Sequence, residues 1–99
     1  MYKILSICGS GIATSTLVAS RLKDGLEEHG ITDISITEAN VSEAGGLIEN
    51  NPPDVIIHTT SLESVDLKGV KAFGAMPILL NLNAGALYKE IADYLKGIK

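Results

Sequence analysis

The sequence is poor in the residues that build disulfides, metal sites and membrane spans. It has one cysteine, two histidines (His29 and His58) and no tryptophan among 99 residues. A single cysteine cannot form an internal disulfide, and so few donors predict no zinc site. No apolar run approaches the roughly 20 residues that a membrane-spanning helix needs, and no signal-peptide pattern precedes the first expected strand. We therefore expect a cytoplasmic protein with a reduced thiol and without a metal or other cofactor.

Basic residues are also scarce. Eight Lys and Arg residues face 12 Asp and Glu residues, which gives a net charge of −4, and the lysines are spread singly along the chain. A nucleic-acid-binding protein normally gathers its cations on one surface, so we expect no nucleic-acid partner. The length suits one compact domain and hardly two. We expect a single domain over residues 1–99 that is a monomer when alone.

Apolar patterns predict alternating strands and helices in the first half of the chain. Residues 3–7 are almost wholly apolar and predict a strand that is buried on both faces. Residues 14–29 follow helical spacing, with Thr14 or Ser15 as the cap and Gly30 as the C-terminal stop. Alternation over residues 33–38 predicts a second strand. Residues 42–48 give only a weak helix, because Gly45 and Gly46 lie in its middle.

The second half continues this alternation with one ambiguous segment. Residues 54–58 predict a third strand and residues 76–81 a fourth, with Pro77 tolerated at its start. Asn83 is expected to cap a final helix that extends to Ile98. Between them, residues 59–75 are compatible with a helical turn near 61–66 and with a short strand near 70–73.

This order predicts an α/β fold, with an open four-stranded parallel sheet and helices on both faces, Rossmann-like or flavodoxin-like. Ligands of such sheets bind beyond the carboxyl ends of the strands. Residues that follow three of the expected strands should therefore meet at one edge of the sheet. These residues are Cys8 after the first strand, Thr59 and Thr60 after the third, and Asn81 and Asn83 after the fourth.

Residues 4–15 combine an apolar run, the single cysteine, two glycines and small hydroxyl residues. This pattern predicts a strand, a tight loop and a helix N-terminus, with the Cys8 thiol at the turning point. A helix N-terminus offers unpaired backbone N–H groups and the positive end of the helix dipole, which favour a bound anion and a thiolate. We therefore predict that Cys8 is a nucleophile that carries a phosphoryl group.

The residues after Cys8 fit a phosphate cradle that contains no cation. Glycine backbones can turn their N–H groups inward without side-chain collision, and hydroxyl groups add further donors. The predicted phosphate-binding residues are Gly9, Ser10, Gly11, Ile12, Ala13, Thr14 and Ser15. Thr59 and Thr60 are candidate accessory ligands, although hydroxyls at a strand end equally often cap backbone groups. A lone cysteine at the end of a buried strand can also be a small core residue.

Cys8-Gly9-Ser10-Gly11-Ile12-Ala13-Thr14-Ser15-Thr16 resembles the phosphocysteine loop of sugar-specific IIB components of the bacterial phosphoenolpyruvate-dependent phosphotransferase system. Its Ala13-Thr14-Ser15-Thr16 tail is most similar to the galactitol type. The strand spacing, the Thr59-Thr60 pair and the closing helix extend the likeness over the whole chain.

The resemblance implies a phosphotransferase without a cofactor. Cys8 would accept a phosphoryl group from a phosphohistidine of a IIA protein. It would pass this group to a sugar or polyol, galactitol-like by the loop, that a membrane IIC permease imports. The resemblance also implies a cytoplasmic domain that associates with the permease, with exposed apolar residues near the loop, Ile12 among them, as the contact surface.

Three other functions remain open from the residues alone. A low-molecular-weight phosphatase or an arsenate reductase uses a similar strand, cysteine loop and helix, but such a phosphatase has arginine six positions after its cysteine, where this chain has Thr14. It also needs a carboxylic acid for the leaving group, and no Asp-Pro pair occurs here. A flavodoxin-like nucleotide or flavin module would be short for its class and lacks the nucleotide-loop pattern. The last alternative is a plain interaction domain with a buried cysteine.

Overall fold

The structure, a computed structural model, describes residues 2–7, 12–60, 62, 65–80 and 82–98, with the side chains of residues 12–16 outside the description. Four strands form one all-parallel sheet in the order β2-β1-β3-β4. They are β1 (Tyr2–Ile7), β2 (Ile34–Ala39), β3 (Val55–His58) and β4 (Ala72–Gly74). The predicted open four-stranded parallel sheet is therefore confirmed.

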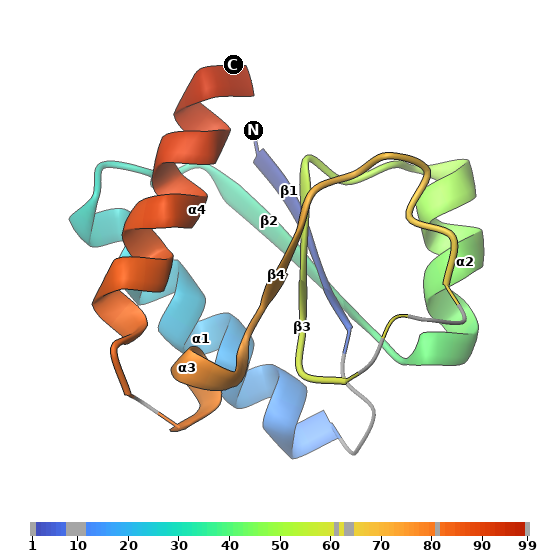
Figure 1. Ribbon diagram of the computed structural model, residues 1–99, viewed down its shortest axis with the longest axis horizontal. Helices are drawn as coiled ribbons and strands as arrows, with labels where there is room; N and C mark the ends of the chain where they lie inside the picture. The colour runs from blue at the N-terminus through green and yellow to red at the C-terminus, as the bar shows by residue number, and fades with distance from the viewer. Residues whose placement is uncertain (1, 8–11, 61, 63–64, 81, 99) are drawn as a thin grey trace.

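Helices cover both faces of this sheet (Figure 1). One face packs against α1 (Ile12–Glu28), α3 (Met76–Leu80) and α4 (Ala84–Ile98), while the other packs against α2 (Val41–Asn50). The chain steps from β1 outward to β2 and then back across β1 to β3. Because crossovers between parallel strands are right-handed, these opposite steps place α1 and α2 on opposite faces. The apolar residues of the segment from Leu62 to Ala72 pack on the α2 face.

The central strand β1 joins the two layers of the core. Ile4 contributes to the cluster under α1 and α4, whereas Leu5 and Ile7 contribute to the cluster under α2. Successive side chains of a strand point to opposite faces, so a strand buried on both faces must be apolar throughout. Ser6 is the one buried polar residue of the described chain. The isoleucine-rich pattern of β1 thus follows from its position in the middle of the sheet.

The end of α1 was predicted correctly from Gly30. The N–H of Gly30 donates to the carbonyl of Glu27, and the N–H of Ile31 donates to the carbonyl of Leu26. Gly30 has a φ of +86°, the left-handed conformation that glycine adopts without a Cβ penalty. Leu26 and Ile31 are both buried in the same cluster. This pair of bonds ends the helix and turns the chain into β2.

The weak helix α2 forms because its N-terminus is well capped. The side chain of Asn40 accepts a hydrogen bond from the N–H of Glu43 at 2.9 Å, and the Glu43 carboxylate accepts one from the N–H of Asn40 at 3.3 Å. This reciprocal capping box satisfies two N–H groups that a helix start leaves unpaired. Ala44 and Ile48 add a buried face. Together, the cap and the buried face offset the low helix propensity of Gly45 and Gly46.

The predicted strand over residues 76–81 is wrong. Residues 76–80 form α3, and the fourth strand is the three-residue β4, which overlaps the short strand considered near 70–73. A short apolar run fits a strand and a buried helix equally well, and proline is favoured in the first turn of a helix. Ile78 is buried while Leu80 is exposed, as expected of a helix with one covered side.

Two helix starts also differ from prediction. The first helix begins at Ile12, so Thr14 and Ser15 belong to its first turn rather than to its cap. Asn83 precedes α4 as predicted, but its φ of +56° is the left-handed conformation, not the extended one of an ordinary N-cap. Asn81 and parts of the turn expected near 61–66 lie outside the described residues.

Candidate functional site at the carboxyl edge of the sheet

The site predicted around Cys8 lies between two described elements. β1 ends at Ile7 and α1 begins at Ile12, while Cys8, Gly9, Ser10 and Gly11 lie outside the described residues. Residues 12–15 are the first four residues of α1. Their backbone N–H groups are those that an α-helix leaves without an intrahelical partner. The described backbone therefore provides four such N–H groups and the positive end of a 17-residue helix close in sequence to Cys8.

The carboxyl end of β3 is fastened to the carboxyl end of β1. His58 pairs with Ile7 in the sheet register, and the N–H of Thr59 donates to the carbonyl of Ile7 at 3.1 Å. Ala75 in turn donates its N–H to the carbonyl of His58 at 2.6 Å, so the end of β4 joins the same edge. Thr59 and Thr60 thus lie beside the last residue before Cys8. Their role as phosphate ligands stays a prediction.

The His58 side chain stabilises this strand end. Its Nδ1 lies 2.8 Å from the carbonyl oxygen of Thr60. A carbonyl oxygen can only accept, so Nδ1 is the donor in this contact. The half-buried imidazole therefore holds the turn of residues 58–60 through a bond to the main chain.

The strand order places a topological switch point between β1 and β3, where the chain leaves the two strands toward opposite faces of the sheet. The connection that leaves β1 enters α1 on one face of the sheet, whereas the connection that leaves β3 packs on the α2 face. The two connections therefore diverge at the carboxyl edge, which lies at the lower end of the molecule in Figure 1. Open α/β sheets bind ligands in the crevice that such a divergence creates. Thr59 borders this position, and Cys8 follows Ile7 directly in the sequence.

Three of the segments that meet at this edge carry no ionised side chain, whereas the end of β2 brings Glu38 opposite Ser6. Residues 4–20, 55–62 and 72–88 contain no Asp, Glu, Lys or Arg, although a fifth of the whole chain is charged. These segments therefore supply neither an arginine that could clamp a phosphate nor a carboxylic acid that could protonate a leaving group. The expected donors are backbone N–H and hydroxyl groups alone. Asn83, predicted to lie at a strand end, instead precedes α4, because residues 76–80 are helical.

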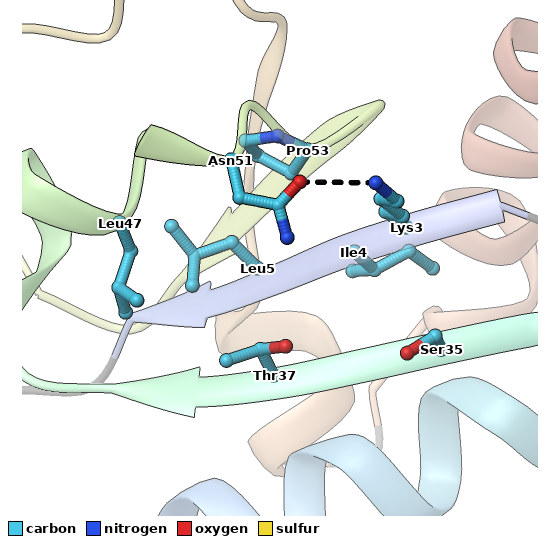
Figure 2. Close-up of a pocket in the computed structure, with 8 residues that line it drawn as sticks. All are labelled: Lys3, Ile4, Leu5, Ser35, Thr37, Leu47, Asn51 and Pro53. Carbon is cyan, nitrogen blue, oxygen red and sulfur yellow. Dashed lines mark hydrogen bonds between the residues drawn. The ribbon is translucent and has the colours of Figure 1, made fainter. Parts of the chain in front are cut away.

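A separate small cavity, of about 110 Å³, lies away from this edge (Figure 2). It opens on the α2 face beside the amino-terminal half of β1, and the Lys3 ammonium donates to the Asn51 amide oxygen at its rim, at 3.0 Å. Its lining residues are Lys3, Ile4, Leu5, Ser35, Thr37, Leu47, Asn51 and Pro53. None of the predicted site residues lines it.

Among the residues that the structure describes, no group of three or more His, Cys, Asp or Glu side chains could hold a metal ion. Within the same residues, no helix has both the length and the apolar character needed to cross a membrane.

The fold defines a small α/β domain whose single cysteine follows the central strand in the sequence and precedes a helix N-terminus. A family model described as "PTS system, Lactose/Cellobiose specific IIB subunit" matches residues 3–96. The chain therefore belongs to this IIB family of the phosphotransferase system, whose members are phosphotransferase components that work with IIA and IIC partners. The Escherichia coli (strain K12) protein named "Putative phosphotransferase enzyme IIB component SgcB" is 33% identical over 95 residues. The match covers 96% of this chain and 98% of that protein.

Proposed function

We propose that this IIB protein is a phosphoryl carrier in which Cys8 is the phosphorylated residue. The observation that carries the proposal is the position of Cys8 in the sequence, directly after Ile7, whose carbonyl is held by Thr59, and four residues before the start of α1. Family membership supplies the reaction class, since a IIB subunit relays a phosphoryl group. Together these facts support a thiolate at the N-terminal end of α1 as the acceptor.

The proposed reaction has two transfers. The Cys8 thiolate attacks the phosphorus of a phosphohistidine on a IIA protein, the S–P bond forms and the N–P bond breaks, so the imidazole leaves. A hydroxyl oxygen of a sugar or polyol held by a membrane IIC permease then attacks the same phosphorus. The thiolate of Cys8 leaves, and the hydroxyl proton goes to a base at the permease site.

The cradle for the phosphoryl group is proposed to be residues 9–15. Backbone N–H groups at the start of α1 and hydroxyls of Ser10, Thr14 and Ser15 would donate to the three phosphoryl oxygens. Thr59 and Thr60 are accessory donors in this proposal. The segments 4–20, 55–62 and 72–88 contain no carboxylic acid that could protonate a leaving group or activate water. A slowly hydrolysed phosphocysteine is what a carrier needs, whereas a phosphatase needs the reverse.

The transported sugar is a finer part of the proposal. The Ala13-Thr14-Ser15-Thr16 tail favours galactitol or a related polyol, while the matching family model is described by lactose and cellobiose. Because the sugar binds to the permease, the identity of the cognate IIC protein decides the question. Sugar phosphorylation by membranes that contain this permease, with galactitol, lactose and cellobiose in parallel, distinguishes the candidates.

The carrier role is tested by intact mass spectrometry. The chain is incubated with phosphoenolpyruvate, the general phosphotransferase proteins and candidate IIA proteins. We expect one added phosphate on the wild type and none on Cys8→Ser. An absence of transfer from every IIA protein, together with turnover of an aryl phosphate, would replace the carrier by a phosphatase. An absence of both, with slow alkylation of Cys8, would make the cysteine a core residue.

A further inference from the structure

The cavity beside the amino-terminal half of β1 exists because α2 covers only part of its sheet face. Buried side chains of α2 pack in one cluster with β1, β3 and Ala39, the last residue of β2. The earlier β2 residues Ile34 and Ile36 pack against the cluster on the opposite face. Ser35 and Thr37 alternate with them, so they lie on the α2 face, where both are exposed. A hollow therefore remains between β2 and α2 (Figure 2).

Polar side chains from three parts of the fold converge on this cavity. Lys3 of β1 pairs with Ser35 of β2 in the sheet register, and Thr37 follows two residues later on the same face. Asn51, directly after α2, accepts a hydrogen bond from the Lys3 ammonium through Oδ1, so its Nδ2 keeps two hydrogens that it can donate. Among the described residues, no hydrogen bond within the protein engages the hydroxyl of Ser35 or Thr37. The cavity thus offers an ammonium, an amide and two hydroxyl groups to a ligand.

The charged group in the lining of the cavity is positive, although the whole chain is acidic. The lining contains Lys3 and neither Asp nor Glu. The Lys3 ammonium is bonded to the neutral Asn51 amide at 3.0 Å, and no ion pair among the described residues includes it. The Asp54 carboxylate accepts instead from the main-chain N–H of Lys3, at 2.8 Å, and does not line the cavity. An anion would therefore gain a charge-assisted hydrogen bond here without displacing a carboxylate.

The rest of the lining is largely apolar, and its size limits the ligand to a short chain. Leu5 is buried, whereas Leu47 of α2 is 36% exposed and Pro53 is half-buried. A ligand that covers Leu47 would remove apolar surface from water. The cavity volume of about 110 Å³ is smaller than the roughly 150 Å³ in which a protein core holds benzene. A ligand of about five non-hydrogen atoms fits this space.

We propose that this cavity is a binding site for a short aliphatic monocarboxylate of about three or four carbon atoms. The carboxylate accepts hydrogen bonds from the Lys3 ammonium and the Asn51 amide, and the β2 hydroxyls supply further donors. The alkyl chain contacts Leu47. A monocarboxylate matches both halves of the lining, whereas phosphate would leave the apolar wall uncovered and an uncharged amide would not use the ammonium.

The proposed site is separate from the edge where Cys8 is expected. The cavity lies at the amino-terminal half of β1, and Cys8 follows the carboxyl end of that strand. The proposal therefore does not rest on the carrier function, and Cys8→Ser should bind the carboxylate as the wild type does.

Titration of the full chain with sodium propanoate tests the proposal, with amide chemical shifts followed by NMR at constant ionic strength. We expect saturable shifts centred on Ser35, Thr37 and Leu47. So small a ligand should bind with a dissociation constant on the order of 1 mM. Lys3→Met keeps the aliphatic stem but lacks the ammonium, so it should weaken binding at least about 5-fold. Lys23→Met removes the same charge from an exposed position of α1 and should change binding less than about 2-fold.

Two further probes on the wild type keep the test independent of how well the Lys3 variant folds. Propanamide has the size of propanoate without its charge, and inorganic phosphate has a charge without an alkyl chain. Both should bind at least about 5-fold more weakly than propanoate. Equal binding of propanamide would show that the ammonium is not used, and equal or tighter binding of phosphate would make the cavity a general anion site. Either result overturns the proposal, as would propanoate shifts that do not saturate or that Lys3→Met leaves unchanged.

Discussion

The N–H of Thr59 donates a hydrogen bond to the carbonyl oxygen of Ile7 at 3.1 Å, so the end of β3 fixes the last residue before Cys8. The bond extends the β1–β3 ladder one residue past the strand that carries Ile57 and His58. His58 supports the same turn through its bond to Thr60. The direction in which the chain leaves β1 toward Cys8 therefore depends on residues about 50 positions away in the sequence.

Replacing Thr59 by proline should disturb this arrangement selectively, because proline has no N–H to donate. We expect Thr59→Pro to lower the rate of Cys8 phosphorylation at least 10-fold and the free energy of unfolding by about 1–3 kcal/mol. Thr59→Val keeps the N–H and the side-chain shape but lacks the hydroxyl, so its rate should fall less than about 3-fold. Equal losses in both variants would assign the effect to the hydroxyl. Transfer rates and urea unfolding measure the two quantities.

Gly25 on α1 lies against the Tyr88 ring on α4. A Cβ atom at Gly25 would overlap Cγ and Cδ2 of the Tyr88 ring, whereas one at Gly46 in α2 would meet no atom within 4 Å. Alanine has a helix propensity about 0.5–1 kcal/mol better than glycine, so Gly46→Ala should raise the free energy of unfolding by about that amount. Gly25→Ala should lower it by about 1–2 kcal/mol, because the ring must shift.

A double-mutant cycle distinguishes this overlap from other effects at Gly25. In a Tyr88→Ala background the ring is absent, so Gly25→Ala should become stabilising, as Gly46→Ala is. Urea unfolding of the four proteins gives the coupling free energy. A Gly25→Ala loss that persists without the ring would contradict the packing explanation.

Burial raises the pKa of the Tyr88 phenol above its ordinary value of 10.0, and the nearby carboxylates of Asp24 and Glu28 raise it further against the opposing charge of Arg21. The folded protein thus keeps the phenol proton at a pH where the unfolded chain loses it. By proton linkage, this stabilising contribution is complete below pH 10 and is lost as the pH rises through the folded-state pKa. The contribution should be absent from Tyr88→Phe.

The difference in unfolding free energy between wild type and Tyr88→Phe should therefore shrink as the pH rises above 10. Phenolate absorbance gives an independent check, since one of the three tyrosines should ionise later than the others and this late component should disappear in the variant. Parallel pH profiles for the two proteins would show that Tyr88 ionises normally.

Much of the fold follows from local pattern. The isoleucine- and valine-rich runs of β1 and β3 can be buried only in the middle of a sheet, and Gly30 marks the end of α1 unambiguously. The apolar run Met76–Leu80 is ambiguous because its length fits both a strand and a short helix. β4 contains an alanine and a glycine, both poor strand formers, and it exists because β3 presents an open edge to Ala72–Gly74. The sequence left a short strand near 70–73 open beside a helical turn near 61–66, and pairing with β3 decides in favour of the strand at residues 72–74.

The candidate site, like the fold, could be predicted from the sequence only in part. Cys8 and its glycines are conspicuous in the sequence, and the end of β3 lies beside β1 as the parallel order predicts. The exposure of Met76 and Leu80 does not follow from the sequence, because the apolar pattern of residues 76–81 predicts a strand. One signal was present: residues 72–88 form a charge-free stretch too long for the three-residue strand within it.

Arg21 on α1 holds the end of α3 through two hydrogen bonds. Its guanidinium is the bond donor that holds the last carbonyls of α3, and hydrogen bonds from a charged donor contribute about 1.5–3 kcal/mol. Arg21→Met keeps the aliphatic stem but leaves these partly buried carbonyls without their donor. We expect the free energy of unfolding to fall by about 2 kcal/mol, which for a chain of this length lowers the Tm by roughly 8–16 °C.

Lys23 on the same helix is the matched control, because it is exposed and its replacement removes the same charge. Lys23→Met should change the free energy of unfolding by less than about 0.5 kcal/mol. Equal effects of the two substitutions on the Tm would mean that only the lost charge matters, and that the bonds from Arg21 do not hold α3.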